Sequence, residues 1–221
     1  MRTANLLAAT ILLGSFAAAC TPEPPAEART DDTVVRTDTP MARTDVALTP
    51  KAGGDVPVGH FDSVELRGGG HVILRYGATE RVTLISGSTQ FTHFHIEDCG
   101  RLVINACTYD CPSHYDLEIQ ILAPHVNAVA IRGGGHIESV PGFPAQGAIT
   151  AAIQGGGDID LRTIDAANGT AAVDGGGKIR IHASRHLTAA VNGGGSIAYW
   201  GAAEVTSAIN GGGSIHRENG G

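Results

Sequence analysis

The chain has 221 residues, enough for one moderate domain, of which 31 are glycine and only 5% are aromatic. A core in such a chain is thin and built mainly from Ile, Val, Leu and Ala. The net charge of −7, without a basic patch, argues against a nucleic-acid partner.

The first residues predict a secretory signal peptide over residues 1–19. Arg2 gives a positive start, and Leu6 to Ala19 form an apolar run that is too short to span a bilayer as a helix. Cys20 follows directly, which resembles the lipobox of bacterial lipoproteins, although Ala17 stands where that pattern prefers Leu. We expect Cys20 to be acylated and to anchor the chain to a membrane. The alternative is an ordinary secreted protein with an unmodified cysteine.

Residues 20–58 are rich in Pro, Thr and mixed charges and lack regularly spaced apolar residues. We therefore expect a disordered tether that holds the following domain away from the membrane. Thr21 is not Asp, so the sorting pattern of bacterial lipoproteins implies an outer-membrane location, facing either the periplasm or the cell surface.

The domain is predicted to cover residues 59–217, with a short tail at 218–221. Its first half contains alternating segments that predict comparatively long paired strands, and no segment has the period and caps of a helix. The predicted strands are 65–75, 81–86, 91–97, 101–106 and 116–122. The fold class is therefore all-β.

Three cysteines lie in this domain. Cys107 and Cys111 bracket a short loop and are the candidate disulfide, which suits an oxidising envelope compartment. Cys99 is expected to be buried and inert, or else to cross-link to a partner.

A Gly-Gly-Gly run followed by any residue and then Ile or Val occurs six times. The runs begin at Gly68, Gly133, Gly155, Gly175, Gly193 and Gly211. The last five begin 22, 20, 18 and 18 residues apart, and a fixed period of this size indicates a stacked architecture of Gly-rich coils of about 18–22 residues.

Strand alternation divides each repeat into two faces. The apolar face is expected to point inward and to include structural glycines, although a surface turn with positive φ is an alternative for them. These glycines are Gly155, Gly157, Gly175, Gly177, Gly193, Gly195, Gly211 and Gly213. The other face carries columns of hydroxyl and amide side chains and is the candidate binding face. Its residues are Thr150, Thr170, Thr188, Thr206, Gln154, Asp174, Asn192 and Asn210.

The segment from Phe61 to Gly70, then Val72-Ile73-Leu74 and the serial glycine repeats, resembles the putative auto-transporter adhesin, head GIN domain family. The resemblance covers roughly His60 to Ile215. It implies a right-handed β-helix-like solenoid in a bacterial envelope protein of adhesin type, and it brings no active site with it. The chain departs from the family pattern by having Gly, rather than Ser or Asp, between the outer glycines.

No catalytic, metal or cofactor site is predicted. Asp158 and Asp160 could serve a polysaccharide lyase or hydrolase on a β-helix scaffold, but we favour the interpretation that they are alternating charges on a solvent face. His71 and His136 occupy matching repeat positions without a visible third ligand.

The function expected is therefore an envelope-anchored binding or structural module. Its partner would be envelope polysaccharide, contacted through the Thr and Asn columns, or another surface protein. The last repeat has little to cover it, so we also expect homo-oligomers formed by end-to-end stacking.

Overall fold

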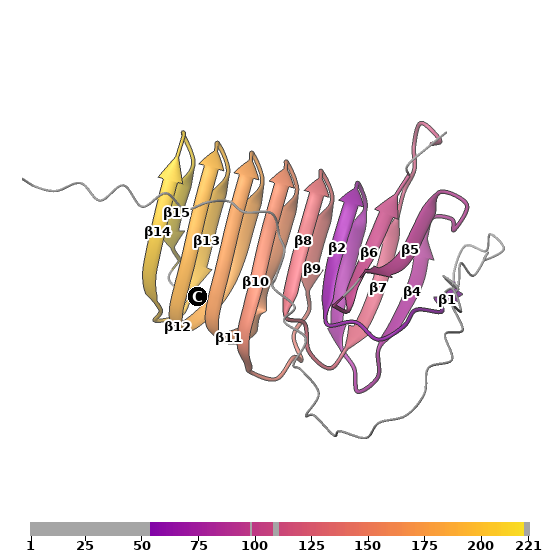
Figure 1. Cartoon of the computed structure of the whole chain (residues 1–221), viewed down its shortest axis with the longest axis horizontal. Helices are drawn as coiled ribbons and strands as arrows, with labels where there is room; N and C mark the ends of the chain where they lie inside the picture. Colours follow the sequence, from indigo (N-terminus) through magenta and orange to yellow (C-terminus); the bar gives the residue numbers. More distant parts are fainter. Residues whose placement is uncertain (1–53, 98, 108–110, 219–221) are drawn as a thin grey trace, which may run out of the picture. The chain divides into compact units, whose positions relative to one another are not determined.

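The strands of the domain form one strongly curled mixed sheet (Figure 1). The structure, a computed structural model, describes residues 54–97, 99–107 and 111–218, which all belong to one compact unit, Val46–Gly221. Within these residues the fold is all-β without a helix, as the sequence predicts. The strands are β1 (Gly54–Val56), β2 (Ser63–Gly68), β3 (His71–Tyr76), β4 (Arg81–Ser86), β5 (Thr92–Glu97), β6 (Arg101–Ala106), β7 (Glu118–Ala123), β8 (Ala128–Gly133), β9 (His136–Ser139), β10 (Gln146–Gly155), β11 (Asp158–Gly175), β12 (Lys178–Gly193), β13 (Ser196–Trp200), β14 (Glu204–Asn210) and β15 (Ser214–Arg217).

The signal peptide, Cys20 and the tether up to residue 53 lie outside the described residues, as does the end of the tail. In the part of the chain that is described, no helix could span a membrane. The predicted end of the tether at residue 58 is wrong. β1 pairs with β4, and Val56 is buried in the core, so the domain begins earlier than residue 59.

The sheet has two rows of strands, which share β11 and β12. The first row has the order β5-β6-β2-β8-β10-β11-β12-β14, and the second has the order β1-β4-β7-β3-β9-β11-β12-β13-β15. β11 and β12 belong to both because they are long: Asp158–Leu161 pair in the second row and Ala166–Gly175 in the first. Figure 1 shows these long strands bending from one row into the other.

Consecutive repeats pair in parallel and in register. Gly133 lies beside Gly155, Gly155 beside Gly175, and Gly175 beside Gly193. An alignment of the sequence on its glycine runs is therefore also the hydrogen-bonding register of the sheet. Equivalent residues of successive repeats therefore lie side by side and form columns across the strands of each row.

The three glycines of a run have different roles, and the prediction that both outer ones face inward is wrong for the first. Gly193, the first of its run, has a φ of 117°, and a Cβ there would lie 2.6 Å from the carbonyl oxygen of Gly175. Gly195, the third, is buried, and a Cβ there would lie 2.6 Å from the carbonyl oxygen of Gly177. Gly194, between them, has nothing within 4 Å of the Cβ position. The first glycine thus makes the turn between the rows, and the third permits close backbone packing.

The core lies between the two rows and is aliphatic. Ile153, Val173 and Val191 enter it from the first row, and Ile159 and Ile179 enter it from the second, each with at most 2% of its surface exposed. The sequence places these residues at every second position on either side of the glycines, which is the period of a strand with one buried face.

The first half of the domain differs from the prediction in two respects. The strand expected over residues 65–75 is divided into β2 and β3, because Gly68 and Gly70 adopt positive φ values of 102° and 131° and turn the chain between rows. The strands here are also not the longer ones: β2 to β7 have six residues each, whereas β11 has 18. What distinguishes this half is antiparallel pairing, which among the described strands joins β1 to β4, β4 to β7 and β5 to β6.

A buried carboxylate stabilises the outer side of β2. Glu65 is only 1% exposed and accepts hydrogen bonds from Arg67 Nε at 2.6 Å and Arg101 Nη1 at 3.1 Å. The Nε of Arg132 lies 2.8 Å from the same carboxylate. Burial alone would raise the pKa of Glu65, but the hydrogen bonds and charges of these three arginines lower it below its ordinary value. The carboxylate therefore links β2 to both of its neighbours, β6 and β8.

We expect Gly195→Leu to destabilise the domain by about 3 kcal/mol, the upper part of the range for overpacking, because the new side chain meets Val173 and the Gly177 backbone. Gly177→Leu should behave in the same way. The measurement is the free energy of unfolding by chemical denaturation. The matched control is Gly194→Leu, at the open middle position, which should change stability by much less. Equal losses for Gly194→Leu and Gly195→Leu would contradict the assignment of the third glycine to the packed interior.

We expect Glu65→Gln to reduce the free energy of unfolding at pH 7 by about 2 kcal/mol, because three arginines lose their shared charge partner while remaining partly solvated. The lowered pKa of Glu65 also has a pH consequence. The stabilisation is complete above the ordinary value of 4.5 and is lost as the pH falls through the lower value of the folded state. Denaturation between pH 7 and pH 3 should therefore show a steeper acid loss in the wild type than in Glu65→Gln. Glu97→Gln, at the exposed rim of the same cluster, is the control and should cost less than about 1 kcal/mol.

Candidate functional site

The predicted binding residues lie together on the outer side of the first row, and we call this surface the Thr/Asn face. Thr150, Thr170, Thr188 and Thr206 are register partners on β10, β11, β12 and β14. Gln154, Asp174, Asn192 and Asn210 form a second column on the same strands. In both columns every residue is exposed except Thr150 and Asn192, which are partly exposed.

The amide column is ordered by its own hydrogen bonds. Asn210 Nδ2 donates to Asn192 Oδ1 at 3.1 Å, and Asn192 Nδ2 donates to Asp174 Oδ1 at the same distance. Between the two columns lie Ala172, Ala190 and Ala208, whose methyl groups leave the surface flat. Neighbouring strands are about 4.8 Å apart, so this face offers polar groups at a constant spacing.

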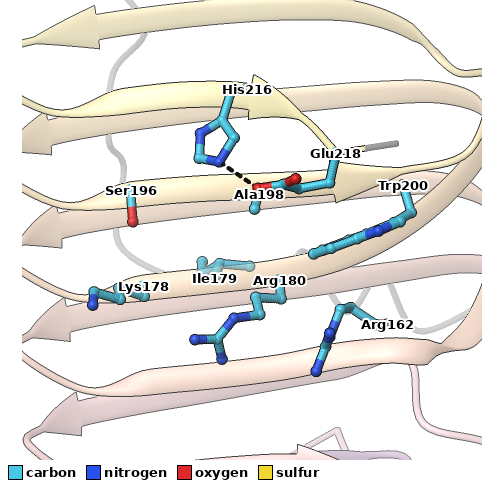
Figure 2. Close-up of a pocket in the computed structure, with 9 residues that line it drawn as sticks. All are labelled: Arg162, Lys178, Ile179, Arg180, Ser196, Ala198, Trp200, His216 and Glu218. Carbon is cyan, nitrogen blue, oxygen red and sulfur yellow. Dashed lines mark hydrogen bonds and ion pairs between the residues drawn. The ribbon is translucent and has the colours of Figure 1, made fainter. Parts of the chain in front are cut away.

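A second candidate site lies on the outer side of the second row. It is a shallow hollow of about 340 Å³ with a strongly polar lining (Figure 2). Its charged lining residues are Arg162, Lys178, Arg180, His216 and Glu218, and Trp200 supplies an aromatic ring. Figure 2 shows that these side chains come from successive strands of the row, from β11 to the residue that follows β15.

Trp200 is held at the edge of the hollow by Arg162. The guanidinium of Arg162 lies 5.2 Å from the centre of the indole ring, within the distance of a cation–π contact. Arg162 also binds both carboxylate oxygens of Asp160, with Nη2 at 2.7 Å from Oδ2 and Nε at 2.9 Å from Oδ1. The aromatic ring is thereby linked to a fixed ion pair, which sets its position.

The carboxylates Asp158 and Asp160 are neutralised by arginines. Arg180 Nη1 lies 2.9 Å from Asp158 and 3.5 Å from Asp160. Burial alone would raise the pKa of Asp160, but the hydrogen bonds from Arg162 and the charges of Arg162 and Arg180 lower it below its ordinary value. Asp160 is also buried, so it is not the freely solvated residue that an alternating charge pattern suggests.

Two groupings were not found by sequence reasoning. In the hollow, Arg162 contacts Trp200; both residues stand seven positions after the first glycine of their run, so the glycine alignment carried a signal for this pair. Glu138 lies beside both His71 and His136. The signal for this second grouping was present, since Glu138 follows His136 by two residues and strand alternation returns it to the same face.

The structure tests the predictions for three of the four cysteines. Cys107 and Cys111 form a disulfide. Cys99 is exposed, with a φ of 74°, and is not a free thiol, so the expectation of a buried inert cysteine is wrong. The predicted lipidation site, Cys20, lies outside the described residues.

The chain is similar to several solved structures, at low identity. A putative adhesin from Bacteroides fragilis NCTC 9343 is 16% identical, with a TM-score of 0.45, over 75% of this chain and 96% of that one. A putative adhesin from Parabacteroides distasonis ATCC 8503 is also 16% identical, with a TM-score of 0.37, over 75% and 96% of the two chains. A putative cell adhesion protein from Clostridium sporogenes ATCC 15579 is 12% identical, with a TM-score of 0.35, over 76% and 99%.

No curated protein matches the chain. The family model that matches is the putative auto-transporter adhesin, head GIN domain, over residues 145–203. The match covers the regular repeats from β10 to β13 and is shorter than the span His60 to Ile215 expected from the resemblance. The description of the family is that of a putative adhesin. The sequence resemblance is thereby confirmed over residues 145–203, which match the putative auto-transporter adhesin, head GIN domain.

Proposed function

We propose that the chain is a lipid-anchored, non-catalytic binding module of the bacterial outer membrane that contacts envelope polysaccharide through its Thr/Asn face. The observation that carries this proposal is the hydrogen-bonded column of Asp174, Asn192 and Asn210 beside the column of threonines. Acylation of Cys20 after a signal peptide, followed by a tether, would place that face at a distance from the membrane.

The regular repeats suit this role as a right-handed β-helix-like solenoid. Parallel, in-register pairing of successive repeats supports this description, because each repeat then adds one strand to each row. A polysaccharide also repeats along one direction and carries hydroxyl groups at regular intervals. A flat face with fixed donors and acceptors loses little conformational entropy when it binds such a chain.

An enzymatic function, the alternative of a polysaccharide lyase or hydrolase, receives less support. A general acid in glycoside hydrolysis needs a raised pKa so that it holds a proton near neutral pH. The pKa of Asp160 is lowered, and its two oxygens are occupied by Arg162. The other candidate binding partner is a second surface protein, in place of polysaccharide.

We expect the double variant Thr170→Val/Thr188→Val to weaken retention of envelope polysaccharide by about tenfold. Each exposed hydroxyl that donates or accepts one hydrogen bond contributes about 0.5–1.5 kcal/mol, and valine preserves its shape. The measurement is a pull-down of sacculi and soluble envelope glycan by residues 46–221, with the length of the retained glycan analysed afterwards.

The matched control is Lys178→Ala/Ser196→Ala, on the opposite side of the domain in the hollow. Unchanged retention by this control, with intact glycan, supports the Thr/Asn face. Retention lost only in the control would instead assign binding to the hollow, whose cations suit carboxylate or sulfate groups. Shortened glycan would support the alternative function of a polysaccharide lyase or hydrolase. If the wild type retained no glycan, a protein partner would be favoured.

We also propose that two copies associate through the open end of the stack. β14 pairs only with β12 and β15 only with β13, so among the described residues one edge of each is without a strand. Ile209 aligns with the buried Val191 and Val173 but is 48% exposed, because no further repeat among the described residues covers it. A second copy at this end would bury the same column and pair the free backbone groups.

Light scattering across a range of protein concentrations should therefore show a mass that rises above the monomer. Ile209→Lys should shift association to higher concentrations without reducing the melting temperature, since its side chain is already half exposed. Ile85→Lys, at a similarly exposed position on β4 near the other end of the second row, is the control. A constant monomeric mass in the wild type would contradict end-to-end association.

A further inference from the structure

Three potential metal ligands converge on the outer side of the second row. His71 comes from β3, and His136 and Glu138 come from β9; one ligand atom from each lies within 4.8 Å of the others. His71 Nε2 is 3.2 Å from Glu138 Oε1, and His136 Nε2 is 3.6 Å from Glu138 Oε2. The two imidazole rings are 5.0 Å apart and tilted by 48°. The nitrogen atoms thus face the same carboxylate from two sides.

The fold fixes this grouping through its register. His71 and His136 each follow a Gly-Gly-Gly run, and the parallel pairing of β3 with β9 places them directly side by side. Glu138 is two residues beyond His136, so its side chain returns to the same face of the sheet. The three ligands therefore sit on paired strands rather than on loops, and their separation needs little adjustment to close on an ion.

A second carboxylate lies beside one of the histidines. Asp158 Oδ1 lies 3.7 Å from His136 Nδ1, on the side of the ring away from Glu138, and Arg180 holds the same carboxylate oxygen at 2.9 Å. Histidine ligands of metals usually donate a hydrogen bond from their second ring nitrogen to a carboxylate, and Asp158 is the carboxylate placed to accept one from Nδ1 of His136 when Nε2 binds an ion.

We propose that His71, His136 and Glu138 bind a divalent transition ion of the zinc type. Two imidazoles and one carboxylate are a set of three protein ligands that zinc accepts, with water in a fourth position. The side chains are 37–38% exposed, which leaves room for that water. Calcium and magnesium do not suit the site, because they prefer ligand sets made of oxygen. The ion would cross-link β3 to β9, where the first half of the domain meets the repeats.

The test is zinc binding by the full chain, purified without a histidine tag and measured by competition with a chromophoric chelator. We expect one tightly bound Zn²⁺ per chain and a rise in melting temperature on its addition. His71→Ala, His136→Ala and Glu138→Gln should each weaken binding by at least about tenfold, and Asp158→Asn should weaken it by about tenfold through the orientation of His136. Co²⁺ in place of zinc should give the visible absorption of a tetrahedral site in the wild type and not in His71→Ala/His136→Ala.

His186→Ala is the matched control, because His186 lies 3.8 Å from a carboxylate of Glu204 but has no second histidine in that ion pair. It should bind zinc as the wild type does, and circular dichroism should show that all variants remain folded. Unchanged affinity and stoichiometry in His71→Ala/His136→Ala would overturn the proposal. So would the lack of stoichiometric binding by the wild type at micromolar zinc.

Discussion

Direct contact between the backbones of successive glycine turns is the constraint on which the rest of the domain depends. In four of the six runs the middle glycine donates its N–H to the carbonyl of the first glycine of the preceding run, as in Gly176 to Gly155 at 2.9 Å and Gly194 to Gly175 at 3.0 Å. Two residues on, Lys178 and Ser196 donate to the carbonyls of Gly157 and Gly177. A side chain on the first or third glycine would occupy the space of this contact. The turns are therefore part of the hydrogen-bond ladder, and they lock the two rows into one register.

The same constraint explains how much could be predicted from the sequence. The glycine alignment places Thr170 beside Thr188 and Asn192 beside Asn210 because a run that must stack on the preceding run leaves no freedom of register. The inward positions of Ile153 and Ile159 follow from alternation on either side of the run. Within a run, however, strand alternation assigns Gly193 and Gly195 to the same face and predicts the same role for both. Only the backbone conformation separates the turn with positive φ from the packed position.

The features that the sequence did not predict arise where pairing is not between consecutive repeats. β2 lies between β6 and β8, and β3 lies between β7 and β9, so the register of these strands joins segments many residues apart. Glu65 gains Arg101 and Arg132 in this way, and His71 gains Glu138. No fixed repeat length encodes these contacts, although the glycine runs that begin at Gly68 and Gly133 place His71 beside His136. The bulge in β11 between Leu161 and Asp165 is likewise a local irregularity that the repeat alignment does not predict.

In-register stacking also explains why the two outer faces differ in character. Identical residues become neighbours at about 4.8 Å, and like charges at that distance repel, whereas an amide both donates and accepts and can pair with its own copy. From β10 to β14 the first row therefore repeats mostly uncharged groups, with Asp174 as the charged member of the amide column, and Asn192 and Asn210 bind each other. The second row changes sign from one repeat to the next, with Lys178 beside Asp158 and Arg180 beside Asp160.

The one place where acidic residues are neighbours in that row is Glu138 beside Asp160. There each carboxylate has cationic or potentially cationic partners of its own: Asp160 has Arg162, and Glu138 has His71 and His136. A face that can repeat must be nearly uncharged, so it can present a periodic surface to an extended ligand. A face that carries charge must vary along the stack, and it can form only individual sites.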